Sequence, residues 1–144
     1  MESSGFDPNL DVVATGYTGA GGAPSEAAYL DASVPYAAGA LYSTVEDLYR
    51  WDRALYGEQL VSQERLEAMF TPYASTPIGG YGYGWFITRQ HQREVVRHGG
   101  GGDGFVAVIE RYPDDQAALI LLSNREITDI GAIADTIGGM LFQG

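Results

Sequence analysis

The stretch Arg97–Phe105, RHGGGGDGF, holds the residue types of this sequence that are best suited to chemistry. His98 precedes four consecutive glycines, and an apolar run from Phe105 to Ile109 follows them. Backbone without a Cβ lets a ligand approach closely, and free amides there can point at a developing oxyanion. His98 could donate a hydrogen bond or assist proton transfer. The same residues also fit a flexible hairpin turn with an exposed histidine, so both interpretations stay open.

Several other chemistries are excluded by residue type. All eight basic residues are arginines, so no lysine is present for a Schiff base or a P-loop. The sequence has no cysteine, which excludes disulfides, thiolate zinc sites and cysteine nucleophiles. No serine lies in a Gly-x-Ser-x-Gly nucleophile elbow. The match of His-Gly-Gly-Gly to the oxyanion-hole motif of lipases is therefore weak. A phosphate-binding loop should lead into a helix, whereas a strand-like run follows these glycines.

The two histidines do not predict a metal site. His91 and His98 are seven residues apart, and a carboxylate such as Asp103 would have to complete the ligand set. This is not a recognised ligand spacing, so with regard to metal binding both histidines are interpreted as ordinary surface or structural residues. The sequence therefore predicts neither a metal nor another cofactor.

Composition limits the class of protein and its partners. The 144 residues are enough for one domain with one apolar core, and 45% of them are hydrophobic. A net charge of −11 repels phosphate backbones and anionic membranes, so nucleic acid is not an expected partner. No apolar run approaches the roughly 20 residues of a membrane span. The acidic opening MESSGFDPNLD does not fit a signal peptide, and the lack of cysteine leaves the compartment open.

The sequence pattern predicts the helices and strands that position the glycine stretch. Residues 1–42 predict mostly coil, with at most one short strand at LDVVA (10–14), and residues 43–71 predict two helices. Ser43 and Glu46 predict a capping box for the first helix, and Ser62 predicts the start of a second helix over 63–70. Residues 80–124 predict about four antiparallel strands, and the apolar run 117–122 predicts a strand covered on both faces.

A closing helix is predicted over 128–142, packed on the sheet. Its apolar positions recur with helical spacing: Ile130, Ile133, Ala134, Ile137, Met140 and Leu141. From this stripe we expect Ile133→Asp to destabilise the fold by several kcal/mol. The resulting prediction is one α+β domain over 1–144, with two helices before the sheet and one after it.

Four stretches together resemble a known family: YAAGALYSTVEDLYRW (36–51), YGYGWFI (81–87), RHGGGGDGF (97–105) and ALILLSN (118–124). They are similar to the serine β-lactamase-like superfamily, within it the branch of class C β-lactamases, D-alanyl-D-alanine carboxypeptidases and family VIII esterases. The resemblance implies a partial β-lactamase/transpeptidase-like fold and an acyl substrate: a β-lactam, an ester or a D-amino-acid peptide. It implies that His98, Gly99 and Gly100 are the third catalytic motif, in its His-x-Gly form. The amide of Gly101 would then be half of the oxyanion hole.

The sequence departs from this family in its nucleophile. Without lysine it has no Ser-x-x-Lys motif, and no tyrosine is followed two residues later by asparagine. We therefore expect the chain to be the C-terminal portion of a longer hydrolase and inactive alone. Its expected partner is the missing N-terminal part or further copies of itself. The alternative is a non-catalytic binding module, which should have a complete core, whereas a fragment should expose a large apolar face.

Overall fold

The computed structural model describes residues 1–6, 14–19 and 22–142. Within these residues it has an α+β architecture, as predicted, with three α-helices and a six-stranded antiparallel sheet. A short 3-10 helix, η1 (Tyr36–Ala38), precedes the first α-helix. The α-helices are α1 (Val45–Ala54), α2 (Gln63–Phe70) and α3 (Ile130–Phe142).

The strands of the large sheet follow one another both along the chain and across the sheet, each antiparallel to its neighbours. Between β7 (Phe105–Tyr112) and β8 (Ala117–Ser123), the connection is the 3-10 helix η2 (Pro113–Asp115). In order across the sheet, the strands are β3 (Ala74–Thr76), β4 (Gly79–Tyr81), β5 (Phe86–Gln90), β6 (Arg93–Gly102), β7 (Phe105–Tyr112) and β8 (Ala117–Ser123).

The prediction of about four strands was wrong, because the short hairpin β3–β4 precedes the four longer strands. The alternating aromatics at 81–85 also do not form one strand. Tyr81 ends β4, Gly84 has a φ of +78°, and the Gly82 N–H donates to the Trp85 carbonyl at 2.8 Å to close a turn. Period-two spacing of aromatics therefore marked a hairpin turn, whose glycines supply conformations that other residues rarely adopt.

Two tight turns fix the register around β6. His91 and Gln92 join β5 to β6 with φ values of 48° and 63°, and Asp103 and Gly104 join β6 to β7 with 52° and 86°. Positive φ at both central residues is the type I′ pattern, whose twist matches that of the flanking strands. Asp-Gly is a favoured pair for this turn, whereas nothing in the sequence pattern marked His91-Gln92 as one.

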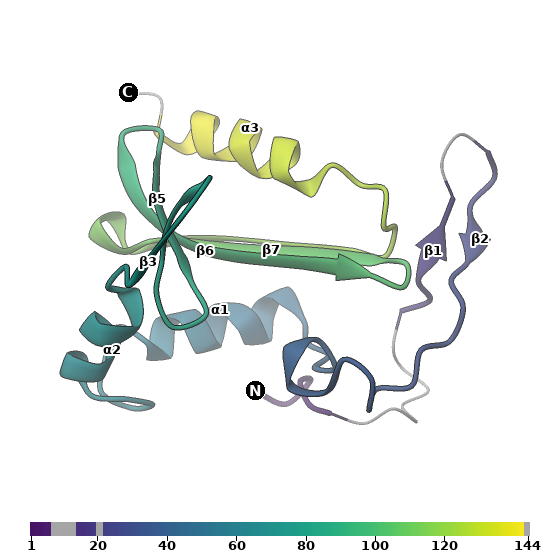
Figure 1. Ribbon diagram of the computed structural model, residues 1–144, viewed down its shortest axis with the longest axis horizontal. Coiled ribbons are helices and arrows are strands. Elements are labelled where there is room, and N and C mark those ends of the chain that lie inside the picture. The colour runs from purple at the N-terminus through teal and green to yellow at the C-terminus, as the bar shows by residue number, and fades with distance from the viewer. Residues whose placement is uncertain (7–13, 20–21, 143–144) are drawn as a thin grey trace.

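Helices cover both faces of the sheet, with α3 on one face and α1 on the other (Figure 1). The core under α3 contains side chains that are at most 8% exposed: Val95, Val108, Tyr112, Leu119 and Ala134. Gly138 lets the helix approach closely, because a Cβ there would lie 2.9 Å from the His91 ring and 3.0 Å from the Tyr112 hydroxyl.

The predicted apolar stripe of α3 was wrong at three of its positions. Ile130, Ala134 and Ile137 pack on or in the core. The side chains of Ile133, Met140 and Leu141 are 44%, 71% and 58% exposed. The helix is apolar on most of its surface, so sequence spacing alone could not decide which side faces the sheet. The two buried glycines of α3, Gly138 and Gly139, mark the side that does.

The helix starts agree only in part with prediction. Thr44, not Ser43, caps α1: its Oγ1 accepts the Asp47 N–H at 3.2 Å, while the Ser43 hydroxyl lies 2.6 Å from that of Ser4. The bounds of α2 agree with the predicted 63–70, and Ser62 is its N-cap residue, although its side chain makes no capping hydrogen bond. Strand β8 is less covered than expected, since Leu122 is 43% exposed and β8 is the last strand of the described sheet.

A small hairpin, β1 (Tyr17–Thr18) paired with β2 (Ser25–Glu26), lies beside the turn between β6 and β7. The Tyr17 N–H lies within hydrogen-bonding distance of the Gly104 and Asn124 carbonyl oxygens, at 3.2 and 2.9 Å. The predicted short strand at LDVVA falls on 10–14 and lies, except for Ala14, outside the described residues. Among the described helices, none combines the length and apolar character needed to cross a bilayer.

Asp47 attaches the N-terminal residues to α1. Its buried carboxylate accepts hydrogen bonds from the Ser3 N–H at 2.8 Å, the Ser4 hydroxyl at 2.9 Å and the Arg50 guanidinium at 2.8 Å. Burial by itself favours the neutral acid, but these donors outweigh it and lower the pKa of Asp47 below the ordinary 3.8. The carboxylate is therefore the stable form in this site at neutral pH.

We expect this attachment to weaken in acid. Because the folded state has the lower pKa, the contribution of Asp47 to stability is complete above pH 3.8 and lost as the pH falls through the folded value. In an NMR titration, the Ser3 amide resonance should move in this acid range, and Asp47→Asn should abolish the movement. Asp31→Asn is the control, since Asp31 bonds only locally to Ser33 and should leave Ser3 unchanged. A Ser3 resonance that does not titrate in the native chain would contradict this prediction.

Candidate active site

The predicted site residues lie where β6 loses one of its two neighbours. Strand β6 pairs with β7 from Val96 to Gly102. Its pairing with β5 ends at Arg97, opposite Phe86. From His98 to Gly102, β6 therefore has β7 on one side and, in the described part of the chain, no paired strand on the other. Along the glycine run, β6 thus has one free edge, where the described sheet is otherwise regularly paired.

The register decides which glycine amides face that free edge. Along an antiparallel strand, successive residues direct their N–H and C=O groups alternately to the two sides. Gly102 and Phe105 close the tight turn to β7, so Gly102, Gly100 and His98 direct these groups toward β7. Arg93 closes the turn to β5, so the odd-numbered residues face the other way. Gly99 and Gly101 therefore present their backbone groups to the free edge, and Gly100 does not.

His98 lies against two aromatic rings from neighbouring strands. Its Nε2 is 3.3 Å from the Tyr81 hydroxyl, and its ring stacks on Phe86 with centroids 5.5 Å apart and planes at 29°. The imidazole is half-buried, so it is fixed on one side and accessible on the other. Tyr81 and Phe86 lie in the family-like stretch YGYGWFI, but sequence reasoning did not assign them to the site. Their positions beside His98 depend on the β4–β5 hairpin.

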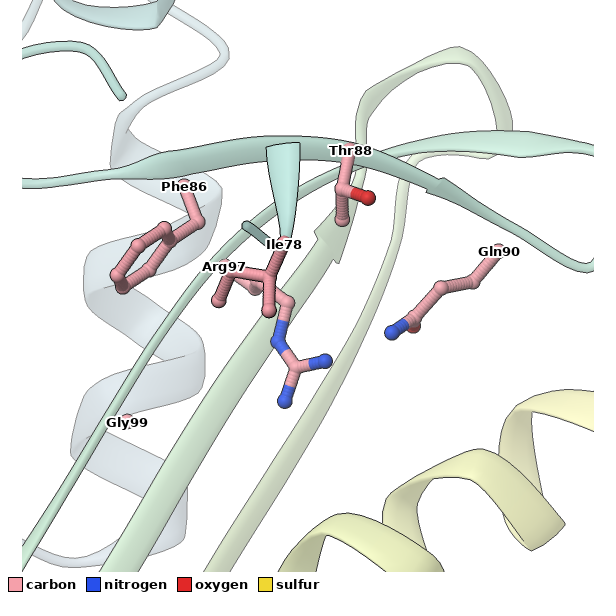
Figure 2. A pocket seen from close by; sticks show the side chains of 6 residues that line it. All are labelled: Ile78, Phe86, Thr88, Gln90, Arg97 and Gly99. Atoms are coloured by element: carbon pink, nitrogen blue, oxygen red, sulfur yellow. The ribbon is translucent and has the colours of Figure 1, made fainter. Parts of the chain in front are cut away.

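A pocket of about 380 Å³ lies beside the glycine run, on the face of the sheet that bears Arg97 (Figure 2). Gly99 lines it, whereas the other predicted site residues do not. The Arg97 guanidinium forms an ion pair at 3.2 Å with the buried Glu110 carboxylate. The residues that line the pocket are Ile78, Phe86, Thr88, Gln90, Arg97 and Gly99.

Glu110 also accepts a hydrogen bond at 3.0 Å from the Tyr112 hydroxyl, which is buried under α3. Burial, and then the negative charge of Glu110, raise the pKa of the Tyr112 hydroxyl well above its ordinary value. Tyr112 is therefore a protonated donor at neutral pH. It fixes Glu110 and, through it, the Arg97 side chain that immediately precedes His98.

The residues considered for a metal site lie far apart. His91 is in the turn that begins β6, where its Nε2 lies 3.2 Å from an Asp135 carboxylate oxygen of α3. Asp103 is in the turn after the other end of this ten-residue strand. Across residues 1–6, 14–19 and 22–142, no three His, Cys, Asp or Glu side chains come together as a ligand set.

Comparison with known proteins identifies the family. A family model described as Beta-lactamase matches residues 5–137. The chain belongs to the Beta-lactamase family. A penicillin-binding protein of Bacillus subtilis (strain 168) is 34% identical over 91 residues, which are 61% of this chain and 20% of that protein. The resemblance inferred from the four sequence stretches is thereby confirmed at the level of the family.

Two solved structures show the same fold. The octameric penicillin-binding protein homologue from Pyrococcus abyssi superposes with a TM-score of 0.85 at 27% identity, over 99% of this chain and 34% of that one. The penicillin-binding protein from Bacillus halodurans gives a TM-score of 0.77 at 21% identity, over 95% of this chain and 44% of that one. This Beta-lactamase family chain thus spans less than half the length of each of these proteins.

Proposed function

We propose that the chain is the C-terminal portion of a serine hydrolase that works through an acyl-enzyme, and that it is inactive alone. The observation that carries the proposal is the free edge of β6, where the Gly101 N–H points away from β7 beside an accessible His98. A backbone amide fixed by a regular strand is preorganised to stabilise negative charge on an acyl oxygen. Membership of the Beta-lactamase family supports acyl transfer as the reaction class.

In this proposal, the carbonyl carbon of a β-lactam, ester or D-amino-acid peptide is attacked by a serine that the missing part supplies. The carbonyl oxygen becomes an oxyanion and accepts hydrogen bonds from Gly101 N–H and from the amide of that serine. When the tetrahedral intermediate collapses, the bond between the acyl carbon and the departing nitrogen or oxygen breaks. The departing atom takes up the proton that the serine hydroxyl has lost, and His98 donates a hydrogen bond beside it. Water then hydrolyses the acyl-enzyme and regenerates the serine.

Exposed apolar side chains support a missing part that packs on this chain. Tyr29, Val34, Tyr36 and Leu41 are 69–74% exposed in the segment before α1, and Met140 is 71% exposed on α3. The first four are close in sequence, and exposed apolar side chains concentrated in one segment fit a surface that packs on a partner. The expected partner is the N-terminal part of the same protein or further copies of the chain, as in the octameric homologue.

The isolated chain should neither hydrolyse a chromogenic ester or cephalosporin nor gain acyl mass on a serine. With a preceding segment that supplies Ser-x-x-Lys and Tyr-x-Asn, a burst and acylation of that serine are expected. In that longer protein, Gly101→Pro removes the proposed donor and should lower kcat about 10²–10³-fold. Gly101→Ala is the matched control, because it keeps the N–H; its Cβ would lie 2.9 Å from Val106 Cγ1, so that side chain must shift.

Rapid turnover by the isolated chain, with acylation of a serine within residues 1–144, would contradict the inactive-fragment proposal. Equal kcat values for Gly101→Pro and Gly101→Ala would overturn the role of the Gly101 amide. A longer protein that binds the cephalosporin without acylation would favour the non-catalytic binding module.

A further inference from the structure

Three rings from three strands meet at the start of the glycine run: Tyr81 of β4, Phe86 of β5 and His98 of β6. Tyr81 and Phe86 are register partners, and their rings pack edge to face with centroids 4.7 Å apart. Phe86 stacks on His98 at 5.5 Å, and Tyr81 meets His98 edge to face at 6.3 Å. The polar contact in this cluster joins the Tyr81 hydroxyl to His98 Nε2 at 3.3 Å.

Strand pairing fixes the backbone of Tyr81, and the edge-to-face contact with Phe86 supports its ring, both independently of the imidazole. Strand β4 pairs with β3 on one side and β5 on the other. The Tyr81 carbonyl accepts the Tyr73 N–H at 2.9 Å. Phe86 already packs on one face of the imidazole, so the main effect of the Tyr81 hydroxyl is to orient the His98 ring through a hydrogen bond. A single hydrogen bond to one ring nitrogen determines which tautomer of a neutral histidine is populated.

We propose that Tyr81 is a positioning residue for His98: its hydroxyl donates to Nε2 and holds the imidazole in the Nδ1–H tautomer. Nε2 is thereby occupied, and Nδ1–H is the donor left for a ligand at the free edge of β6. This inference rests on the proposed function for its purpose, because the ligand is the departing group of the acyl substrate. The hydrogen bond itself can be tested without any substrate.

The test is NMR of the chain labelled with ¹⁵N-histidine, at a pH where the imidazole is neutral. The chain has two histidines, so His91→Gln assigns their signals. In the native chain, His98 should show an unprotonated Nε2 and a protonated Nδ1. Tyr81→Phe, which removes only the hydroxyl, should shift Nε2 toward the protonated form. Tyr83→Phe is the control, because Tyr83 is 62% exposed and stacks on Tyr73 instead.

Phe86→Leu separates hydrogen bonding from stacking, and it provides a second test should Tyr81→Phe fail to fold. It keeps the Tyr81 hydroxyl and should leave Nδ1 protonated. Loss of that tautomer in Phe86→Leu, an unchanged His98 spectrum in Tyr81→Phe, or a protonated Nε2 in the native chain would each overturn the proposal. Failure of the acylation experiment would leave this NMR result standing, so the two proposals fail separately.

Discussion

Asp52→Ala should lower the free energy of unfolding by about 3–5 kcal/mol, because it leaves a buried arginine without its carboxylate. Asp52 of α1 is 0% exposed, and its Oδ1 accepts a hydrogen bond at 2.5 Å from the Arg111 Nε of β7. Arg111 is 1% exposed and lies over the rings of Tyr56 and Phe70, at 4.9 and 5.1 Å. Water cannot readily replace the lost partner there.

The reference for this variant is an ion pair of similar geometry at the surface. Arg93 and Asp115 approach to 3.0 Å, with side chains 43% and 29% exposed. Asp115→Ala should therefore cost less than about 1 kcal/mol. Asp52 also pairs with Arg53 at 2.6 Å, but the Arg53 side chain is 31% exposed and stays partly hydrated without it. Combining Asp52→Ala with Arg111→Met should therefore recover part of the loss, because the fully buried charge is removed. Urea denaturation measures all four chains, and equal losses for Asp52→Ala and Asp115→Ala would contradict the prediction.

Ala134→Asp should destabilise the chain by about 3 kcal/mol or more, whereas Ile133→Asp, one residue earlier, should cost about 1 kcal/mol or less. Ala134 is 0% exposed among Val95, Val108, Tyr112 and Leu119, where a carboxylate would find neither space nor water. Ile133 is 44% exposed, so its carboxylate would stay hydrated. This ordering replaces the large effect that the apolar stripe predicted for Ile133.

Thermal and urea unfolding, followed by circular dichroism, should separate the two aspartate variants. Ala134→Ser is a useful intermediate, since it adds a small polar group without a charge. An Ile133→Asp loss as large as that of Ala134→Asp would mean that α3 packs on the sheet through a different side.

Where the energetics are local, sequence and structure agree. Helix α2 occupies the predicted residues, and the turn between β7 and β8 begins at a proline, which favours turns. Such features depend on propensities and turn chemistry within a few residues. The first helix was capped by Thr44 because the adjacent Ser43 hydroxyl bonds to Ser4, a residue 39 positions away. That choice depends on tertiary contact and could not be made from the local sequence.

The candidate site likewise has features that the sequence predicted and features that depend on tertiary contacts. Sequence pattern selected His98 and Gly99–Gly101, and stretches spread along the chain indicated the family. The family resemblance singled out the Gly101 amide, but the sequence pattern did not show that Gly99 and Gly101 face the free edge while Gly100 faces β7. That difference comes from two turns at opposite ends of β6, and one of them, His91-Gln92, has no sequence signature.

By itself, the sequence determined the chemistry that this chain can offer: glycine amides and a histidine, with no lysine or cysteine. Residue type and spacing suffice for that, because they limit which groups exist at all. Tertiary structure alone decided which side of α3 is buried, which amides are free, and that Asp52 meets Arg111 across 59 residues. These outcomes depend on contacts between distant segments, whose energies no local pattern contains.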